Sequence, residues 1–421
     1  MDISASGSMI KKMKYKDILS NKDAAPILLA INFSRLAAGL VPFGLIALYS
    51  SKHEYAYAGI ASSLLMATGA LSAPYKGKLI MRFAPVKTVI PLSMIYCLFV
   101  ALGAFLSYSN KPFYIAIVFL FAGNLVAPPT PALVRTLWTR IANNQDYNRA
   151  LHALDSITEE LVFAITPLIT AFLWSTVGAF WVIPVGLLCG FISTSSIIIL
   201  AGRKNAPTYE LIHSSDNAYI RASANSTDTR SSSIYFNRIT WGLLGPMLGL
   251  GAAMGALSII LTRWSEVSIG EQYASGIILS IISFSGFFAG LLFGKFKINS
   301  LSTATQYTIA SLAIGVGILF ISLGFDIAFV VIGAVILGSA MTIMFIASFV
   351  LIGEHYEVVE QTEMNAAIGA SFDIASGVSN LSAGFLISMF GLLASFHVMS
   401  IAILPLVALS FLLQAKNRLR S

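Results

Sequence analysis

Long apolar stretches separated by short polar segments make up most of the chain. An α-helix needs about 20 apolar residues to cross a hydrocarbon layer about 30 Å thick. We therefore predict an all-α membrane protein with twelve transmembrane helices. Their expected ranges are 26–49, 55–75, 88–107, 112–134, 151–174, 177–201, 241–262, 272–294, 303–323, 327–352, 365–390 and 392–413.

One polar interval, at 202–240, is much longer than the others and is rich in Ser, Asn and Thr. It contains few large apolar side chains, so it cannot bury enough surface to fold alone. We predict a flexible cytoplasmic linker there, between an N-terminal six-helix bundle at 26–201 and a C-terminal six-helix bundle at 241–414. Cytoplasmic tails are expected at 1–25 and 415–421.

The two halves resemble each other at a nearly constant spacing. A shift of 217 residues aligns several glycines and a Gly-Lys pair: Gly59 with Gly276, Gly69 with Gly286, and Gly77-Lys78 with Gly294-Lys295. A shift of 218 aligns Asp155 with Asp373. Many transporters are built from such repeats, with the substrate site near the midplane where the repeats meet. We therefore expect two pseudo-symmetric bundles.

Lys and Arg are distributed unevenly between the two sides of the membrane. With the N-terminus inside, 22 of the 26 fall in inner loops and tails, whereas Lys52, Lys111 and Arg263 fall outside. Cytoplasmic loops carry the excess of Lys and Arg. We expect a multi-pass protein of the cell's inner (plasma) membrane with both termini cytoplasmic. The inner loop at 353–364 departs from this pattern, with four Glu and no Lys or Arg.

The composition supports a membrane protein and argues against several other classes. Of the 421 residues, 57% are hydrophobic and only 11% are charged, compared with about 25% charged in soluble domains. The net charge of +7 is spread over short loops, so no nucleic-acid partner is expected. Both cysteines lie in apolar stretches, so we expect no metal site and no cofactor. The sequence has no HExxH, P-loop or GxSxG motif, which disfavours a membrane enzyme and an ATP-driven pump.

The fifth apolar stretch carries the acids Asp155, Glu159 and Glu160 in its first half. An ionisable residue inside a membrane is expensive and usually marks a substrate or proton path. At 3.6 residues per turn, Asp155, Glu159 and Thr166 share one narrow stripe of the helix. Counting about 1.5 Å per residue from Ala150 places Glu159 about 13 Å deep. The alternative is that the helix starts later and the acids lie at the lipid headgroups.

The twelve spans, the duplication and the Gly-Lys segment after the second span together resemble the major facilitator superfamily. That family has a glycine, an Asp-Arg pair, a second glycine and further basic residues in this loop. Here Gly77, Arg82 and Lys87 match, whereas Met81 replaces the acid and Ala84 replaces the second glycine. The resemblance implies that Gly77 and Arg82 take part in the conformational change.

Two further segments resemble particular transporters of this family. Thr166-Pro167 stands where the family's drug:proton antiporters have a Gly-Pro pair that bends the fifth span, and a proline alone preserves such a bend. A second resemblance is to a bacterial subgroup of presumed exporters. It is carried by the run Ala127-Pro128-Pro129-Thr130-Pro131, by Arg135 and Trp138, and by Asp155 and Glu159-Glu160.

Arg35 lies inside the first span, about 13 Å from the cytoplasmic face. In the major facilitator fold the first and fifth spans belong to the same half and can touch. A guanidinium beside two carboxylates holds one ionised and leaves the second able to exchange a proton. We therefore predict that Glu159 or Glu160 couples transport to protons, with Arg35 as partner and Asp155 nearby. The alternative is a static ion pair that fixes helix packing.

Several further polar residues within or beside the spans are candidates for lining a substrate cavity: Asp373, Asn32, Asn124, Asn380 and Arg135. Near Asp373 and Asn380, the glycines at 377 and 384 offer another explanation, which is close approach between helices.

The resemblance implies a secondary transporter that moves an unidentified small molecule by alternating access, with proton-coupled efflux by antiport favoured. Proton-coupled uptake, or a sensor or scaffold on the same fold, remain the alternatives. We expect a monomer whose partners are the small-molecule substrate, protons and the lipid bilayer.

Overall fold

The computed structural model describes residues 18–142, 145–213, 237–295, 301–324, 326–356 and 358–413. These residues form helices and connecting turns, with no β-strand among them. The N-terminal half contains α2 (Ala24–Ser50), α3 (Tyr55–Phe83), α4 (Pro85–Tyr108), α5 (Phe113–Leu125), α6 (Thr130–Ile141), α7 (Gln145–Val177), α8 (Ala179–Ala201) and α9 (Tyr209–His213). The C-terminal half contains α11 (Arg238–Ile269), α12 (Ala274–Lys295), α13 (Thr303–Ser322), α14 (Ile327–His355), α15 (Val358–Ala408) and the 3-10 turn η2 (Leu409–Leu413).

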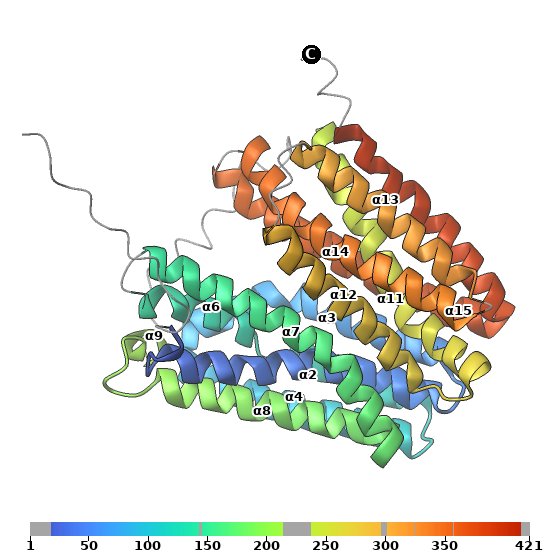
Figure 1. Ribbon diagram of the computed structural model, residues 1–421. Helices are drawn as coiled ribbons and strands as arrows, with labels where there is room; N and C mark the ends of the chain where they lie inside the picture. Colours follow the sequence, from blue (N-terminus) through green and yellow to red (C-terminus); the bar gives the residue numbers. More distant parts are fainter. Residues whose placement is uncertain are drawn as a thin grey trace, which may run out of the picture.

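The prediction of an all-α membrane protein with two six-helix bundles is confirmed. Nine helices in the described part of the chain are long and apolar enough to cross a membrane. The helix α15 comprises two of the twelve predicted spans, because the chain changes direction at Gly391, where φ is 78°. Glycine adopts this backbone conformation without the steric penalty that a side chain would bring. Figure 1 shows the two bundles packed against each other.

Three elements differ from the expected ranges. The fourth span, predicted as continuous over 112–134, is broken between α5 and α6, because its prolines remove helical hydrogen bonds. The helix α7 begins at Gln145, six residues before the predicted start, so its acids lie further into the helix. Part of the predicted linker is folded, since α9 buries Leu211 and Ile212 against the N-terminal bundle.

The repeat in the sequence corresponds to two equivalent contacts between the halves. A Cβ built at Gly59 of α3 would lie 2.6 Å from the carbonyl oxygen of Asn380 on α15. A Cβ built at Gly276 of α12 would collide with the carbonyl oxygen of Pro167 on α7. Only glycine permits such a close approach of two helices. The aligned glycines therefore hold the two bundles together at symmetry-related positions.

These contacts lie toward one end of the molecule, which we call the closed end. It contains the end of α2 at Ser50, the start of α3 at Tyr55, and the connection from α11 to α12 at Gln272. We call the opposite end, where α2 and α7 begin, the open end. In Figure 1 the two bundles meet at the closed end, on the right of the view.

The segment that resembles the family's signature loop is mostly helical. The helix α3 continues through Gly77 and Arg82 to Phe83, so the connection to α4 is the single residue Ala84. The side chains at 77–82 lie outside the described part of the structure. Ala84 has φ 62° and ψ 142°, a backbone conformation that strains any residue with a Cβ. It occupies the position of the family's second glycine, which explains why glycine suits that position.

We expect Ala84→Gly to stabilise the folded protein by about 1 kcal/mol, because glycine relieves the backbone strain. Thermal unfolding in detergent would measure the change as a higher Tm. The matched control is Ala101→Gly within α4, which should lower Tm, since glycine weakens a regular helix. An Ala84→Gly protein that unfolds at or below the wild-type temperature would contradict the strain.

Candidate functional site

Arg35 of α2 lies at the centre of a network of polar contacts with α7. It is 3% exposed, and its Nη2 lies 2.9 Å from Asp155 Oδ1 and 3.2 Å from Glu159 Oε2. Its Nη1 donates hydrogen bonds to Asn32 Oδ1 at 3.1 Å and to Thr158 Oγ1 at 3.2 Å. Asp155 and Glu159 are four residues apart and therefore lie on one face of α7. One guanidinium thus contacts both carboxylates.

The two carboxylates differ in their access to water. Asp155 is buried at 3% exposure, whereas the side chain of Glu159 is 26% exposed. Glu159 also lies 3.8 Å from Nη2 of Arg135, whose side chain is 60% exposed. Glu159 is therefore positioned between a buried guanidinium and a solvated one. Water can reach its carboxylate, whereas the carboxylate of Asp155 is enclosed beside Arg35.

The remaining acid of the predicted group, Glu160, belongs to α7, but its side chain lies outside the described part of the structure. The sequence prediction could not choose between Glu159 and Glu160. Within the described residues, Glu159 is the one that contacts Arg35. Its role in proton coupling stays a prediction.

Further along α7, Thr166 and Pro167 form contacts on two sides. Thr166 is fully buried, and a Cβ built at Gly39 of α2 would lie 2.5 Å from its Cγ2. Pro167 faces the other half, where its carbonyl approaches Gly276. The helix α7 therefore joins the ionic contacts with Arg35 to the interface between the bundles.

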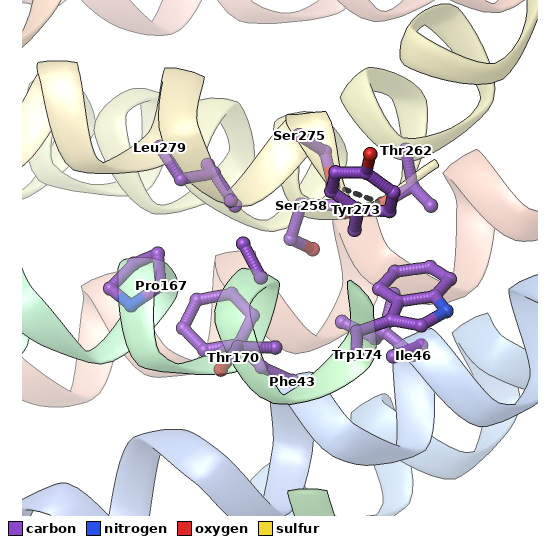
Figure 2. Close-up of a pocket in the computed structure, with 13 residues that line it drawn as sticks. Phe43, Ile46, Pro167, Thr170, Trp174, Ser258, Thr262, Tyr273, Ser275 and Leu279 are labelled. Atoms are coloured by element: carbon purple, nitrogen blue, oxygen red, sulfur yellow. Dashed lines mark hydrogen bonds between the residues drawn. The ribbon is translucent and has the colours of Figure 1, made fainter. Parts of the chain in front are cut away.

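A small cavity between the halves shows how tightly the closed end is packed. Figure 2 shows Pro167, Thr170 and Trp174 on one side of it, opposite residues of α11 and α12. The cavity measures about 20 Å³, which is room for roughly one water molecule. This space between the described residues of the two halves is therefore too small for a solute to pass.

Polar contacts also join the two halves at the closed end. The hydroxyl of Tyr55 donates a hydrogen bond to the carboxylate of Glu266. The same carboxylate is 2.7 Å from Arg263 Nη1 and 3.0 Å from His53 Nδ1. Gln272 Nε2 donates to the carbonyl of Ser50 at 3.0 Å and to the Tyr55 hydroxyl at 3.2 Å. We call the residues His53, Tyr55, Arg263, Glu266 and Gln272 the closed-end cluster.

The closed-end cluster has almost no signature in the amino-acid sequence. Its one local signal is the spacing of Arg263 and Glu266, which are three residues apart at the end of a span. Their partners His53 and Tyr55 come from the other half of the chain, more than 200 residues away. No pattern along the sequence pairs residues across such a separation.

Asp373 lies on the interdomain face of α15. Gly377, Asn380 and Gly384 are four, seven and eleven residues further along and share that face. Those three residues pack against α3, whereas Asp373 is exposed. One turn before it, a Cβ built at Gly369 would have no described atom within 4 Å. The two halves therefore separate toward the open end, and Asp373 borders the space between them.

Asn380 occupies a packed position at this interface. It is 4% exposed, its Oδ1 accepts a hydrogen bond from Ser258 at 2.7 Å, and its backbone carbonyl approaches Gly59. This location agrees with the alternative of close helix approach. Asn32 lies beside Arg35 on α2, and Asn124 lines a separate cavity within the N-terminal bundle. The proposed contacts of these residues with a substrate stay predictions.

Within the described residues, no group of three or more His, Cys, Asp or Glu side chains could hold a metal ion. Among the described side chains, the charged groups of the site are Asp155 and Glu159 on α7, Arg35 and Arg135, and the separate Asp373.

Comparisons with solved structures find the same fold in several transporters. A bacterial homologue of the iron transporter ferroportin, in an inward-facing state, matches with a TM-score of 0.70 at 12% identity, over 95% of this chain and 99% of that one. The nucleoside transporter NupG matches with a TM-score of 0.68 at 14% identity, over 93% and 98% of the two chains. A bacterial homologue of the human lysosomal transporter Spinster, inward-facing and occupied, matches with a TM-score of 0.67 at 12% identity, over 94% and 98%.

A search of curated proteins finds no match. The family model described as Major Facilitator Superfamily matches residues 27–356, which make up most of the chain and extend through the N-terminal bundle to the end of α14 in the C-terminal bundle. With two helical bundles joined at pseudo-symmetric glycine contacts, the chain belongs to the major facilitator superfamily.

Proposed function

We propose that the protein exports a small molecule across the plasma membrane by alternating access, in exchange for protons. Membership of the superfamily supports transport, and the solved structures at these low identities support the fold alone. In this proposal both termini and the open end face the cytoplasm, so the conformation described would be inward-facing. A monomer provides both bundles and the space between them.

The position of Glu159 carries the proposal for proton coupling. Its carboxylate is shared by the buried Arg35 and the exposed Arg135, and it remains in partial contact with water. When Glu159 takes up a proton, the buried Arg35 would be left without a counter-charge unless a second carboxylate lies beside it. An unpaired buried charge is costly. Asp155, at 2.9 Å from Arg35, supplies that second charge.

Protonation of Glu159 would change how α2 and α7 hold each other. The neutral carboxyl group loses its ionic attraction to Arg35 and Arg135, and among the described residues Asp155 then remains as the anionic partner of Arg35. Because Pro167 of the same helix packs against Gly276 in the other half, a shift of α7 reaches the interface between the bundles. In our proposal, the packing of α7 against the other half allows the protonation of Glu159 to affect which end of the protein is open.

Export is favoured over uptake because of the sequence resemblance to presumed bacterial exporters. Uptake by proton symport would use the same residues, but the proton and the solute would cross the membrane in the same direction. A sensor or scaffold on this fold would retain ligand binding without flux. Liposomes loaded with a solute separate the three cases, since an inward proton gradient empties them by antiport, fills them by symport or has no effect.

We expect Glu159→Gln to abolish proton movement driven by a transported solute while leaving solute exchange at equal pH intact. The measurement uses proteoliposomes with an internal pH dye and a panel of dipeptides, nucleosides and cationic dyes. Glu210→Gln, on the exposed surface of α9, is the matched control and should behave as wild type. The variants Glu160→Gln and Glu159→Gln/Glu160→Gln test the neighbouring acid. Coupling that persists undiminished in the double variant would exclude both acids from the mechanism.

A further inference from the structure

We propose that a cavity inside the N-terminal bundle, separate from the ionic contacts of Arg35, binds a compact uncharged solute. The inference rests on the proposed transport function and names its substrate class. The cavity measures about 280 Å³ and is lined by residues of α2, α3, α4, α8 and the α5–α6 segment. Ligand pockets for drug-sized molecules start at about 300 Å³, so this cavity suits a smaller molecule.

The broken helix between α5 and α6 contributes one wall of the cavity. The helix α5 has 13 residues, which extend about 20 Å, so the break lies inside the hydrocarbon layer. Irregular backbone at this depth is tolerated where it lines a cavity or is buried in protein. Ala127, Pro128 and Pro131 line the cavity. Broken helices of this kind form binding sites in several transporter folds.

The prolines leave backbone carbonyls of this segment without helical partners. A proline has no N–H, so the carbonyl four residues before it receives no helical hydrogen bond. Pro131 therefore cannot donate to the carbonyl of Ala127, a residue that lines the cavity. A solute with hydroxyl or amide hydrogens can satisfy acceptors of this kind.

Asn124 supplies a fixed acceptor in the same cavity. It is 8% exposed, and both hydrogens of its amide are in use, toward the Leu65 carbonyl and toward Thr68 Oγ1 at 2.5 Å. These two bonds determine the orientation of the side chain. No group in the described part of the chain donates to its Oδ1. Asn124 is among the residues that line the cavity, so this acceptor is available to a donor group of a bound solute.

The other polar groups of the lining are hydroxyls. Tyr96 and Ser34 line the cavity, and neither hydroxyl has a hydrogen-bond partner among the described residues. No Asp, Glu, Lys, Arg or His is among the lining residues. A charged solute entering this space would lose its hydration without gaining a counter-charge. The lining therefore selects a neutral molecule with both donors and acceptors.

The cavity also communicates with the rest of the site. Ala38 of α2 lines it and is exposed, so a solute can enter on that side. Met66 lines it too, and the sulfur of Met66 accepts a contact from Asn380 Nδ2 of the other half at 3.7 Å. Ser34 directly precedes Arg35 on α2. A solute in the cavity thus contacts α2 beside the ion pairs and lies next to the interface between the bundles.

The first experiment measures the charge selectivity of the cavity without a known substrate. Ser34→Cys, in a chain with Cys97 and Cys189 replaced by serine, is reacted with size-matched neutral, cationic and anionic methanethiosulfonates. The relative rate of each reagent is its rate with Ser34→Cys divided by its rate with a free thiol. This relative rate should be at least about tenfold higher for the neutral reagent than for either charged one, because the lining offers no counter-charge. The control is Asp373→Cys in the same background, which borders the open space and should react with all three. Equal relative rates at Ser34→Cys would overturn the proposal.

The second experiment measures binding through thermal unfolding of the full chain in detergent. The probes are neutral molecules no larger than a monosaccharide, paired with charged analogues: glucose with gluconate and glucosamine, and nicotinamide with nicotinate. At least one neutral probe should raise Tm by several degrees in the wild type, and its charged analogue should not. Ala38→Leu, which fills the cavity, and Tyr96→Phe should lose the shift, whereas the control Ala101→Leu on the exposed side of α4 should keep it.

The binding proposal is overturned if no neutral probe stabilises the wild type, if charged analogues stabilise it equally, or if the shift survives in Ala38→Leu and Tyr96→Phe. Each of these outcomes leaves proton coupling through Glu159 intact, because that proposal is measured by proton movement in liposomes.

Discussion

Replacing Arg35 with leucine is expected to destabilise the protein by about 3–5 kcal/mol, because it leaves the carboxylate of Asp155 buried without its cation. Asp155 is 3% exposed and lies 2.9 Å from the guanidinium, so water cannot replace the lost partner. Thermal unfolding in detergent should show a large fall in Tm for the single variant.

A double variant separates the ion pair from other roles of Arg35. In Arg35→Leu/Asp155→Leu both charges are removed together, and replacing a buried pair with apolar residues is often neutral for stability. We expect most of the lost Tm to return. If the double variant unfolds as early as the single one, the packing of the arginine or its bonds to Asn32 and Thr158 explain the loss instead. A single variant as stable as wild type would contradict the ion pair itself.

Removing the closed-end cluster's central carboxylate with Glu266→Gln should shift the protein toward conformations open at the closed end. The carboxylate accepts from Tyr55 and pairs with Arg263 and His53. Hydrogen bonds to charged groups contribute about 1.5–3 kcal/mol, so the ratio of closed to open forms should fall by about ten- to a hundredfold. Tyr55→Phe removes one hydroxyl and should give a smaller shift in the same direction.

The shift is measured by labelling Thr170→Cys, a buried position in the small cavity of the closed end, with a membrane-impermeant thiol reagent. Labelling should be slow in the otherwise unchanged protein and faster after Glu266→Gln. The matched control is Glu54→Gln, which alters an acid between His53 and Tyr55 that does not belong to the closed-end cluster. Unchanged labelling after Glu266→Gln would show that the helix contacts at Gly59 and Gly276 suffice to keep this end shut.

Much of the fold could be predicted because each span is determined locally. A run of apolar residues long enough to cross the hydrocarbon forms a helix wherever it occurs, since its backbone groups must pair within the segment. The repeat at a shift of 217 residues was also visible, and the structure shows that Gly59 and Gly276 make equivalent contacts. The proline run at 128–131 was visible as well, but the span was taken as continuous. Whether such a run ends a helix depends on what surrounds it.

The candidate site, like the fold, could be predicted from the sequence only in part. Burial of Arg35 and of acids in an apolar helix is so unfavourable that the residues must meet partners, and this argument needs the sequence alone. It does not decide which acid pairs with the arginine or which one keeps contact with water. In the structure, Asp155 is enclosed and Glu159 extends to Arg135, because α2 and α7 cross at one particular register set by Gly39 and Thr166.

The sequence by itself determined that this protein crosses the membrane as two related bundles with an arginine and acids in the apolar layer, because hydropathy and charge act residue by residue. The tertiary structure alone decided that Tyr55 contacts Glu266, that one end is shut, and that a broken helix forms one wall of an uncharged cavity. These features depend on contacts between side chains that are far apart in the sequence. No local conformational preference specifies such contacts.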